Sequence, residues 1–221
     1  MCIRDSIVIT SAFRTPIGSF QGSLKDHKAT ELGTAVVKKC MEHSNLNGSE
    51  VDTVILGQVL QTGCGQNPAR QAAINSGIDK DKTATTINQV CGSGLAAVTL
   101  GFNSLKLNDT NIVIAGGQES MTNSPHYLNY RMEKNLSEEK LKDSMLIDGL
   151  IDAYDDYHMG VTAENVAEKY QITRNDQDNF ALNSQKKAIK AISENRFKEE
   201  IVPIKLKDQK IFDKDEYPRS D

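Results

Sequence analysis

Short runs of β-branched residues alternate along the first half of the chain with segments whose apolar residues recur at helical spacing. The predicted strands are 7–10, 53–60, 85–90 and 112–115, and the predicted helices are 29–44, 68–77 and 95–105. Pro68 suits the first turn of its helix, and Gly77 is placed to end it. Strands that alternate with helices predict an α/β layered domain.

The pattern changes after the last of these strands. Residues 121–160 are rich in Met, Asn, Tyr and Asp and lack strand periodicity. Two helices are predicted next, one from near Thr162 and a longer one from Thr173, where Asp176 three residues on completes a capping box. We therefore expect an inserted, mostly helical subdomain. The polar end of the chain, 207–221, carries no predicted closing element and is interpreted as a cut through a loop.

Composition narrows the class of protein. The chain has 221 residues, of which 38% are hydrophobic, and a net charge of −4. Mixed charges with a slight acidic excess argue against nucleic acid or an anionic membrane surface as the partner, because both need clustered Lys and Arg. No apolar run approaches the roughly 20 residues that span a bilayer. The first residues also lack the apolar core of a signal peptide, so we expect a cytoplasmic protein.

The sharpest chemical feature is Cys91, which follows an apolar strand and precedes Gly92-Ser93-Gly94 and an amphipathic helix. A thiol at a helix N-terminus feels the positive end of the helix dipole, which favours the thiolate. The glycines leave room for a substrate carbonyl, and backbone N–H groups at such a turn can stabilise an oxyanion. This arrangement suits nucleophilic acyl transfer.

Two other interpretations of this turn stay open at this point. Cys91 could be a small buried core residue, as most cysteines are. The pattern Gly92-x-Gly94-x-x-Ala97 could be a lax dinucleotide fingerprint, although no acidic residue ends a following strand at the expected distance of roughly 20 residues. The four cysteines form no Cys-x-x-Cys pair, so no zinc site or redox dithiol is predicted.

Several ordered motifs share one resemblance. They are 11–18 (SAFRTPIG), 57–60 (GQVL), 65–71 (GQNPARQ), 88–95 (NQVCGSGL), 115–121 (AGGQESM), 157–160 (YHMG), 162–167 (TAENVA) and 197–203 (FKEEIVP). In this order and spacing they resemble the thiolase family, over essentially all of 7–221. The resemblance implies the thiolase fold, with an N-terminal αβαβα half at 7–120 and an incomplete loop domain at 121–221. Residues 1–6 have no counterpart and are interpreted as a non-native extension.

The resemblance also implies an activity. Cys91 would take an acyl group from one acyl-CoA, and a second acetyl-CoA would condense with it to give acetoacetyl-CoA and CoA, or the reverse. Coenzyme A thioesters would be the substrates, with no cofactor and no metal. The His-Met-Gly sequence is most like that of short-chain enzymes, which implies that His158, Met159 and Leu150 border the acyl pocket. Without the resemblance, His158 would be interpreted as a structural histidine.

The family's other catalytic residues have no match in this chain. They are a Gly-His-Pro histidine, an oxyanion-site Asn and a second cysteine, and no cysteine follows Cys91. We therefore expect this polypeptide to be a fragment that is inactive alone, and the whole protein to be a homodimer or homotetramer. Alternatives are a thiolase of longer-chain specificity, a fatty-acid ketosynthase of the same fold, or a non-catalytic acyl-CoA-binding relative.

Overall fold

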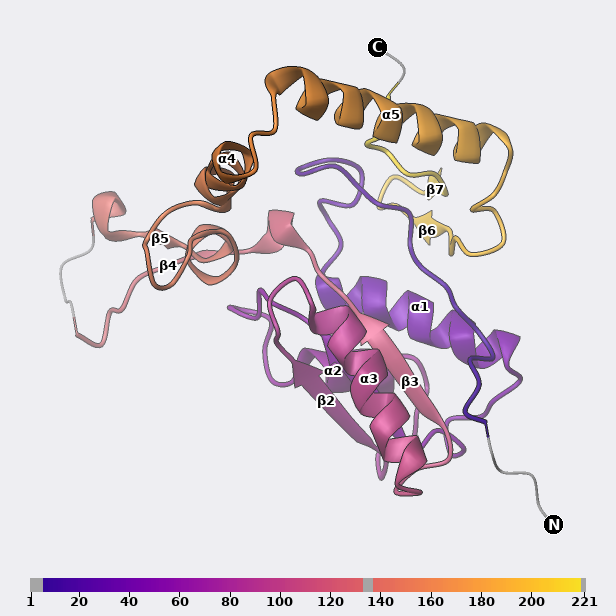
Figure 1. Ribbon diagram of the computed structural model, residues 1–221. Helices are drawn as coiled ribbons and strands as arrows, with labels where there is room; N and C mark the ends of the chain where they lie inside the picture. The colour runs from indigo at the N-terminus through magenta and orange to yellow at the C-terminus, as the bar shows by residue number, and fades with distance from the viewer. Residues whose placement is uncertain (1–5, 133–136, 220–221) are drawn as a thin grey trace.

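A computed structural model describes residues 6–132 and 137–219 (Figure 1). The helices are α1 (Ala29–His43), α2 (Pro68–Asn75), α3 (Ser93–Lys106), α4 (Met159–Lys169) and α5 (Arg174–Ser193). The strands are β1 (Thr53–Gly57), β2 (Thr83–Ile87), β3 (Val113–Gly117), β4 (His126–Tyr127), β5 (Lys142–Asp143), β6 (Ile204–Lys205) and β7 (Ile211–Phe212). A π-helical turn spans Leu146–Leu150, and single 3-10 turns lie at Met121–Asn123 and Glu138–Lys140.

The centre of the molecule is a parallel sheet in the order β2-β1-β3. Helix α3 covers one face, while α1 and α2 pack against each other on the opposite face (Figure 1). All five residues of β1 are buried, because β1 has a strand on each side and helices on both faces. This layered α/β arrangement confirms the predicted fold class.

The main core lies between β1 and the α1–α2 layer. It is built from aliphatic residues of β1, two α1 residues and three alanines of α2, as well as two loop residues: Val37, Met41, Val51, Val54, Leu56, Ala69, Ala72, Ala73 and Ile78. The three alanines are fully buried, which lets α2 approach the sheet closely. On the other face Gly101 serves the same purpose, since a Cβ there would lie 3.0 Å from Cγ1 of Val113. Small residues thus allow close packing of helices on both faces of the sheet.

The predicted strand at 7–10 is wrong. These residues are extended but form no strand, and their side chains are exposed, with Val8 at 70% and Ile9 at 79%. A β-branched run supplies only propensity, whereas a strand needs a hydrogen-bonded neighbour. Within the described ranges, β3 carries β1 on one edge and no strand on the other. The segment 7–14 and this free edge of β3 instead border an apolar groove of about 590 Å³.

The remaining elements follow the prediction with shifts at their ends. The long helix begins where expected, because Thr173 is the N-cap of α5 and exchanges capping-box hydrogen bonds with Asp176. Helix α4 begins at Met159 rather than near Thr162, because His158 caps it. The polar end is more ordered than expected, since β7 lies within 207–221 and pairs with β6. The extension proposed at 1–6 lies outside the described residues except for Ser6.

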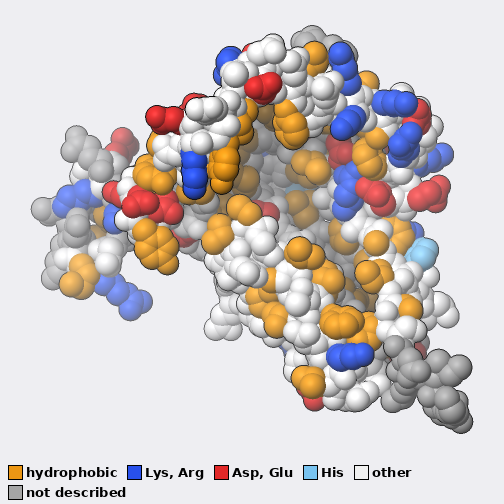
Figure 2. Space-filling view, viewed as in Figure 1, with side chains coloured by type: hydrophobic (Ala, Val, Ile, Leu, Met, Phe, Trp, Pro, Cys, Tyr) orange, Lys and Arg blue, Asp and Glu red, His pale blue; other side chains and the backbone are white. Residues whose placement is uncertain are grey.

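The second part of the chain forms an arm above the sheet (Figure 1). Residues 121–160 contribute short elements, and α4 and α5 continue them as exposed helices with no buried residue. Figure 2 shows a hollow between this arm and the α/β layers, with hydrophobic side chains gathered over the layers below it. The division at residue 120 and the loop-domain assignment of 121–221 stay predictions. Of the helices in the described ranges, none is long and apolar enough to cross a membrane.

Arg14 ties the end of the arm to the start of the chain. Its guanidinium forms a bidentate pair with Asp215 at 2.6 and 2.9 Å and a third bond to Glu200 at 2.6 Å. It also lies 5.1 Å from the centroid of the Phe197 ring. The Arg14 backbone donates to the carbonyl of Glu200 and accepts from the N–H of Val202. Asp215 is only 9% exposed, so this pair is shielded from solvent.

The apolar groove generates a first prediction. We expect the chain to self-associate, because contiguous exposed apolar surface drives association. Val8→Lys with Ile9→Lys places two charges on the groove and should reduce the scattering mass toward that of a monomer. The matched control is Tyr154→Lys, at a side chain 95% exposed outside the groove, which should leave association unchanged. A wild-type chain that is a clean monomer by light scattering, with a cooperative melt, would contradict this prediction.

The Arg14–Asp215 pair predicts a pH dependence. Burial raises the pKa of Asp215, but hydrogen bonds from Arg14 and from the Ile17 N–H, together with the Arg14 charge, outweigh burial and lower this pKa below its ordinary value. The resulting stabilisation is complete above the ordinary carboxyl pKa, about 3.9, and is lost as the pH falls through the lowered pKa. Asp215→Asn should therefore reduce the free energy of unfolding by about 1–2 kcal/mol at neutral pH and by less at about pH 3.

Urea unfolding at the two pH values measures this difference. Asp208→Asn is the control, because Asp208 is exposed and forms its ion pair with Lys210, two residues away. That substitution should leave the free energy of unfolding nearly unchanged. An Asp215→Asn loss of equal size at both pH values would show that the carboxylate charge is not its cause.

Candidate active site

Cys91 lies in the turn between β2, which ends at Ile87, and α3, which begins at Ser93. Its side chain is exposed and its thiol is free. The interpretation of Cys91 as a buried core residue is therefore wrong. Cys91 directly precedes Gly92, the N-cap of α3, and so lies at a helix start as the sequence predicts. Cys91 is thus placed at the positive end of a 14-residue helix and is open to a substrate.

The turn is strained at the residue before the cysteine. Val90 has a φ of 47°, in the left-handed region, which a β-branched residue adopts only as an outlier. Such a conformation costs about 1–3 kcal/mol and persists only where surrounding contacts enforce it. Asn88 supplies one such contact, because its Oδ1 accepts from the Val90 N–H at 2.8 Å. The reversal of direction at Val90 brings Cys91 out of the sheet edge and onto the helix start.

The backbone N–H groups of the turn are mostly used within the turn itself. Gln89 and Val90 donate to side chains, and Gly92 and Ser93 donate to the carbonyls of Gln89 and Val90. Across the described part of the chain, the Cys91 N–H has no acceptor. Within the segment 89–93, the N–H that is left without an acceptor therefore belongs to the predicted nucleophile itself. That N–H is the available donor for an oxyanion formed at the sulfur.

Glycines at the strand ends determine how closely α3 approaches the sheet. A Cβ at Gly57 would lie 2.5 Å from the Cβ of Ser93 and 2.7 Å from the nitrogen of Gly94. A Cβ at Gly117 would lie 3.4 Å from the Cα of Gly94. No side chain fits at Gly57 without moving the helix. The position of Cys91 therefore depends on a bare backbone at the end of β1.

A polar network lies beside these glycines. Glu119 accepts from the N–H of Val59 at 2.8 Å and from the N–H of Leu60 at 3.3 Å. Burial raises the pKa of Glu119, while these backbone hydrogen bonds act in the opposite direction. Gln118 donates to Gln58 at 2.8 Å, and both amides are buried. The network holds the chain just after β1 against the chain just after β3.

The three predicted pocket residues come together on the arm. Leu150 is half-buried at the end of the π-helical turn, and Ile151 forms an antiparallel bridge with His158. His158 is exposed and caps α4, because its Nδ1 accepts from the Gly160 N–H at 2.9 Å. Met159 follows at 39% exposure. The bridge thus brings Leu150 near His158 and Met159, and the cap leaves Nε2 as the free imidazole nitrogen.

The predicted pocket residues and the cysteine turn are both connected to the chain that follows β1. Among residues 6–132 and 137–219, no hydrogen bond joins Cys91 to the segment 150–159. The link runs through the chain after β1, where a Cβ at Gly149 would lie 3.4 Å from the Leu60 side chain. Thr62 also donates to Asp148 at 3.4 Å. The roles of Cys91, Leu150, His158 and Met159 stay predictions, and the arm rests on the same turn that Glu119 holds.

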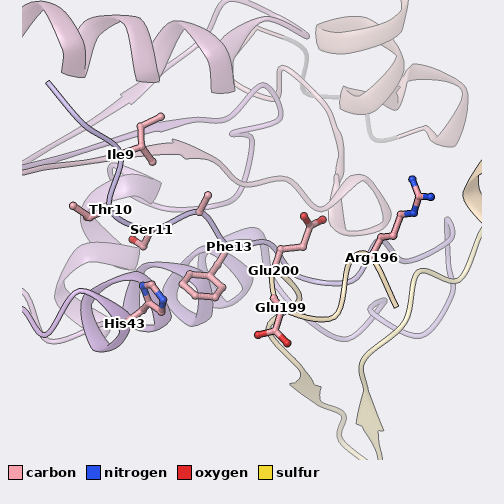
Figure 3. Close-up of a pocket in the computed structure, with 9 residues that line it drawn as sticks. Ile9, Thr10, Ser11, Phe13, His43, Arg196, Glu199 and Glu200 are labelled. Carbon is pink, nitrogen blue, oxygen red and sulfur yellow. The ribbon is translucent and has the colours of Figure 1, made fainter. Parts of the chain in front are cut away.

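A cleft of about 300 Å³ lies away from the cysteine turn and shares residues 9–13 with the apolar groove (Figure 3). Residues 9–13 and His43 border it on one side, and Arg196, Glu199 and Glu200 on the other. It shares no residue with the Cys91 turn or with the predicted pocket. Three or more metal-ligating side chains do not gather at any point in the part of the chain that the structure describes.

The comparison with known families identifies the family of this chain. A family model described as the thiolase N-terminal domain matches residues 7–221. The chain belongs to the thiolase family. For a thiolase, the acyl-cysteine interpretation of the turn is favoured over the dinucleotide fingerprint.

Curated relatives agree with this family. The chain is 51% identical to an acetyl-CoA acetyltransferase of Pseudomonas aeruginosa, over 98% of this chain and 56% of the relative. It is 50% identical to an acetyl-CoA acetyltransferase of Rhizobium meliloti, over 97% and 55%. It is also 50% identical to a probable acetyl-CoA acetyltransferase of Escherichia coli, over 97% and 56%. The chain therefore spans about half the length of the curated relatives it matches.

Sequence reasoning on this thiolase missed the residues that hold the cysteine in place. Asn88 carried a usable signal, because Asn often bonds to the backbone two residues on. Val90 carried none, since a β-branched residue argues against a positive φ. Glu119 was noted only within the motif 115–121, yet it is the half-buried acceptor for two backbone N–H groups.

Substitutions can separate the helix-capping role of His158 from any other role of its imidazole ring. His158→Ala removes the acceptor for the Gly160 N–H and should destabilise α4 by about 1 kcal/mol. His158→Asn keeps a capping acceptor and should leave the helix nearly intact, while removing the imidazole. Amide hydrogen exchange of the first turn of α4 measures both variants. If Asn destabilises α4 as much as Ala does, the imidazole supports this segment by contacts other than the cap.

Proposed function

We propose that this chain carries the acyl-accepting half of a thiolase that condenses two acetyl-CoA molecules to acetoacetyl-CoA and CoA, or runs the reverse cleavage. The observation that carries the proposal is the exposed thiol of Cys91 at the N-terminus of α3, in a chain of the thiolase family. The names of the relatives, which are about 50% identical, support an acetyl group as the one transferred.

The first half-reaction needs a nucleophile and an oxyanion donor. The Cys91 thiolate attacks the carbonyl carbon of acetyl-CoA, and a C–S bond forms as the carbonyl oxygen takes the negative charge. The unpaired Cys91 N–H is close to where this oxyanion develops, because it belongs to the same residue. The tetrahedral intermediate then expels the CoA thiolate, which leaves as CoA after protonation, and acetyl-Cys91 remains.

The second half-reaction needs groups that this chain does not contain. A base removes a proton from the methyl group of a second acetyl-CoA, and the resulting carbanion attacks acetyl-Cys91. The Cys91 thiolate leaves, and acetoacetyl-CoA is released. The base, the histidine that activates the thiol and a further oxyanion site belong to the Gly-His-Pro and later cysteine motifs of the family. We propose that the rest of the protein supplies them and that the whole enzyme is a homodimer or homotetramer.

The arm would set the acyl-chain length. Leu150 and Met159 offer apolar walls, and a methionine adapts its shape to a small acyl group. His158 would face the thioester with Nε2, because Nδ1 is held by the helix cap. A thiolase of longer-chain specificity is the second candidate, since a half-exposed Met159 leaves one wall of the pocket open.

The test uses the product of the uninterrupted coding frame that contains this chain. Incubation with acetyl-CoA should release CoA and place one acetyl group on the peptide that contains Cys91, as found by mass spectrometry. Cys91→Ser should lower turnover by at least about a thousandfold, because the nucleophile is lost. Cys64→Ser is the matched control at a half-buried thiol and should keep most of the turnover.

Acyl-chain length is tested by comparing the cleavage of acetoacetyl-CoA with that of longer 3-ketoacyl-CoA thioesters. A higher kcat/KM for acetoacetyl-CoA is expected. A preference for longer thioesters would assign the second candidate. Absence of any acyl-Cys91 would leave a non-catalytic acyl-CoA-binding protein.

A further inference from the structure

We propose that Ser93 is a positioning residue that holds Val90 in its left-handed conformation and thereby presents Cys91 at the start of α3. The inference rests on the proposed function only in naming Cys91 as the acyl acceptor. Its geometry, which consists of the hydrogen bonds of the turn and the packing of α3 on the sheet, is independent of any substrate.

The Ser93 hydroxyl bonds to both residues before the cysteine. Its Oγ donates to the Val90 carbonyl at 2.6 Å and accepts from the Gln89 N–H at 2.8 Å. A hydroxyl is a donor and an acceptor at once, so one atom satisfies both backbone groups. The Ser93 N–H also donates to the Val90 carbonyl, at 3.1 Å. The carbonyl of the strained residue therefore receives two hydrogen bonds from Ser93.

Ser93 itself is buried and closely packed. It is 4% exposed, and it lies on the bare backbone of Gly57 at the end of β1, where even a Cβ would come within 2.5 Å of it. Water has little access to this position, so it cannot easily replace the hydroxyl if the side chain is shortened. The sheet thus fixes the position of Ser93, and Ser93 fixes the conformation of Val90, which directly precedes Cys91.

Ser93 could instead be an ordinary hydroxyl at a helix start, which stabilises the fold without controlling the cysteine. The two roles differ in what Val90 does. If Ser93 acts by enforcing the positive φ of Val90, a glycine at position 90 should make Ser93 dispensable, because glycine adopts that conformation without strain. A purely structural hydroxyl would be needed equally with valine or glycine at that position.

The experiment measures the alkylation of Cys91 by iodoacetamide in the full chain at neutral pH, with each cysteine followed by peptide mass spectrometry. Cys40 and Cys64 serve as internal references. Ser93→Ala should slow the alkylation of Cys91 at least about threefold relative to these references, because the thiol leaves the positive end of the helix. An unchanged or faster Cys91 reaction, or an equal slowing of all three thiols, overturns the proposal.

The double variant completes the test. In a Val90→Gly background, Ser93→Ala should change the alkylation of Cys91 by less than about twofold. The same slowing in both backgrounds overturns the proposal. If Ser93→Ala alone fails to fold, the double variant should still fold and react like Val90→Gly alone, and an unfolded double variant also overturns it.

Failure of this proposal and failure of the proposed function are distinguishable, because alkylation needs no acyl-CoA. Suppose that the alkylation of Cys91 depends on Ser93 and Val90 as described, but no acetyl-Cys91 forms in the full-length protein. The acyltransferase assignment would then be removed, and the positioning role would be kept. If Ser93→Ala leaves both the acetylation and the alkylation of Cys91 unchanged, the positioning role is overturned and the acyltransferase assignment is kept.

Discussion

The close contact between α3 and the end of β1 is the constraint on which the rest of the site depends. Gly57 presents only backbone to Ser93 and Gly94, so the helix start lies directly on the sheet. Every larger residue at this position would displace the helix by more than its neighbours can absorb. The cysteine, its free N–H and the strained valine all take their places from this one contact.

A second set of contacts ties the strand ends to the arm. Glu119 and Gln118 follow β3 and bond to the segment that follows β1, which in turn lies beside the π-helical turn of the arm. Arg14 ties the far end of the arm to the start of the chain through Asp215. The arm is therefore held at both ends by buried or half-buried polar contacts, while α4 and α5 between them bury no residue completely.

The elements that could be predicted from the sequence are those that local sequence signals specify. The apolar spacing of α1, the proline at the start of α2 and the capping box of α5 each specify an element within a few residues. The segment 7–10 has the composition of a strand but lacks a bonded neighbour, and pairing is not a local property. The position of Cys91 was predictable from its place between strand and helix, whereas the positive φ of Val90 was not, because a β-branched residue disfavours that conformation and no local sequence signal specifies it.

The contacts around Gly57 join segments that are far apart along the chain. Gly57 meets Ser93, and Glu119 bonds to Val59, so the turn is complete only when three strands and a helix have already assembled. Contacts of such long sequence separation form late in folding, because the loops between them must close first. Cys91 is consequently held in its turn only where the sheet and α3 are assembled, and local opening around Gly57 would release the turn that presents the thiol.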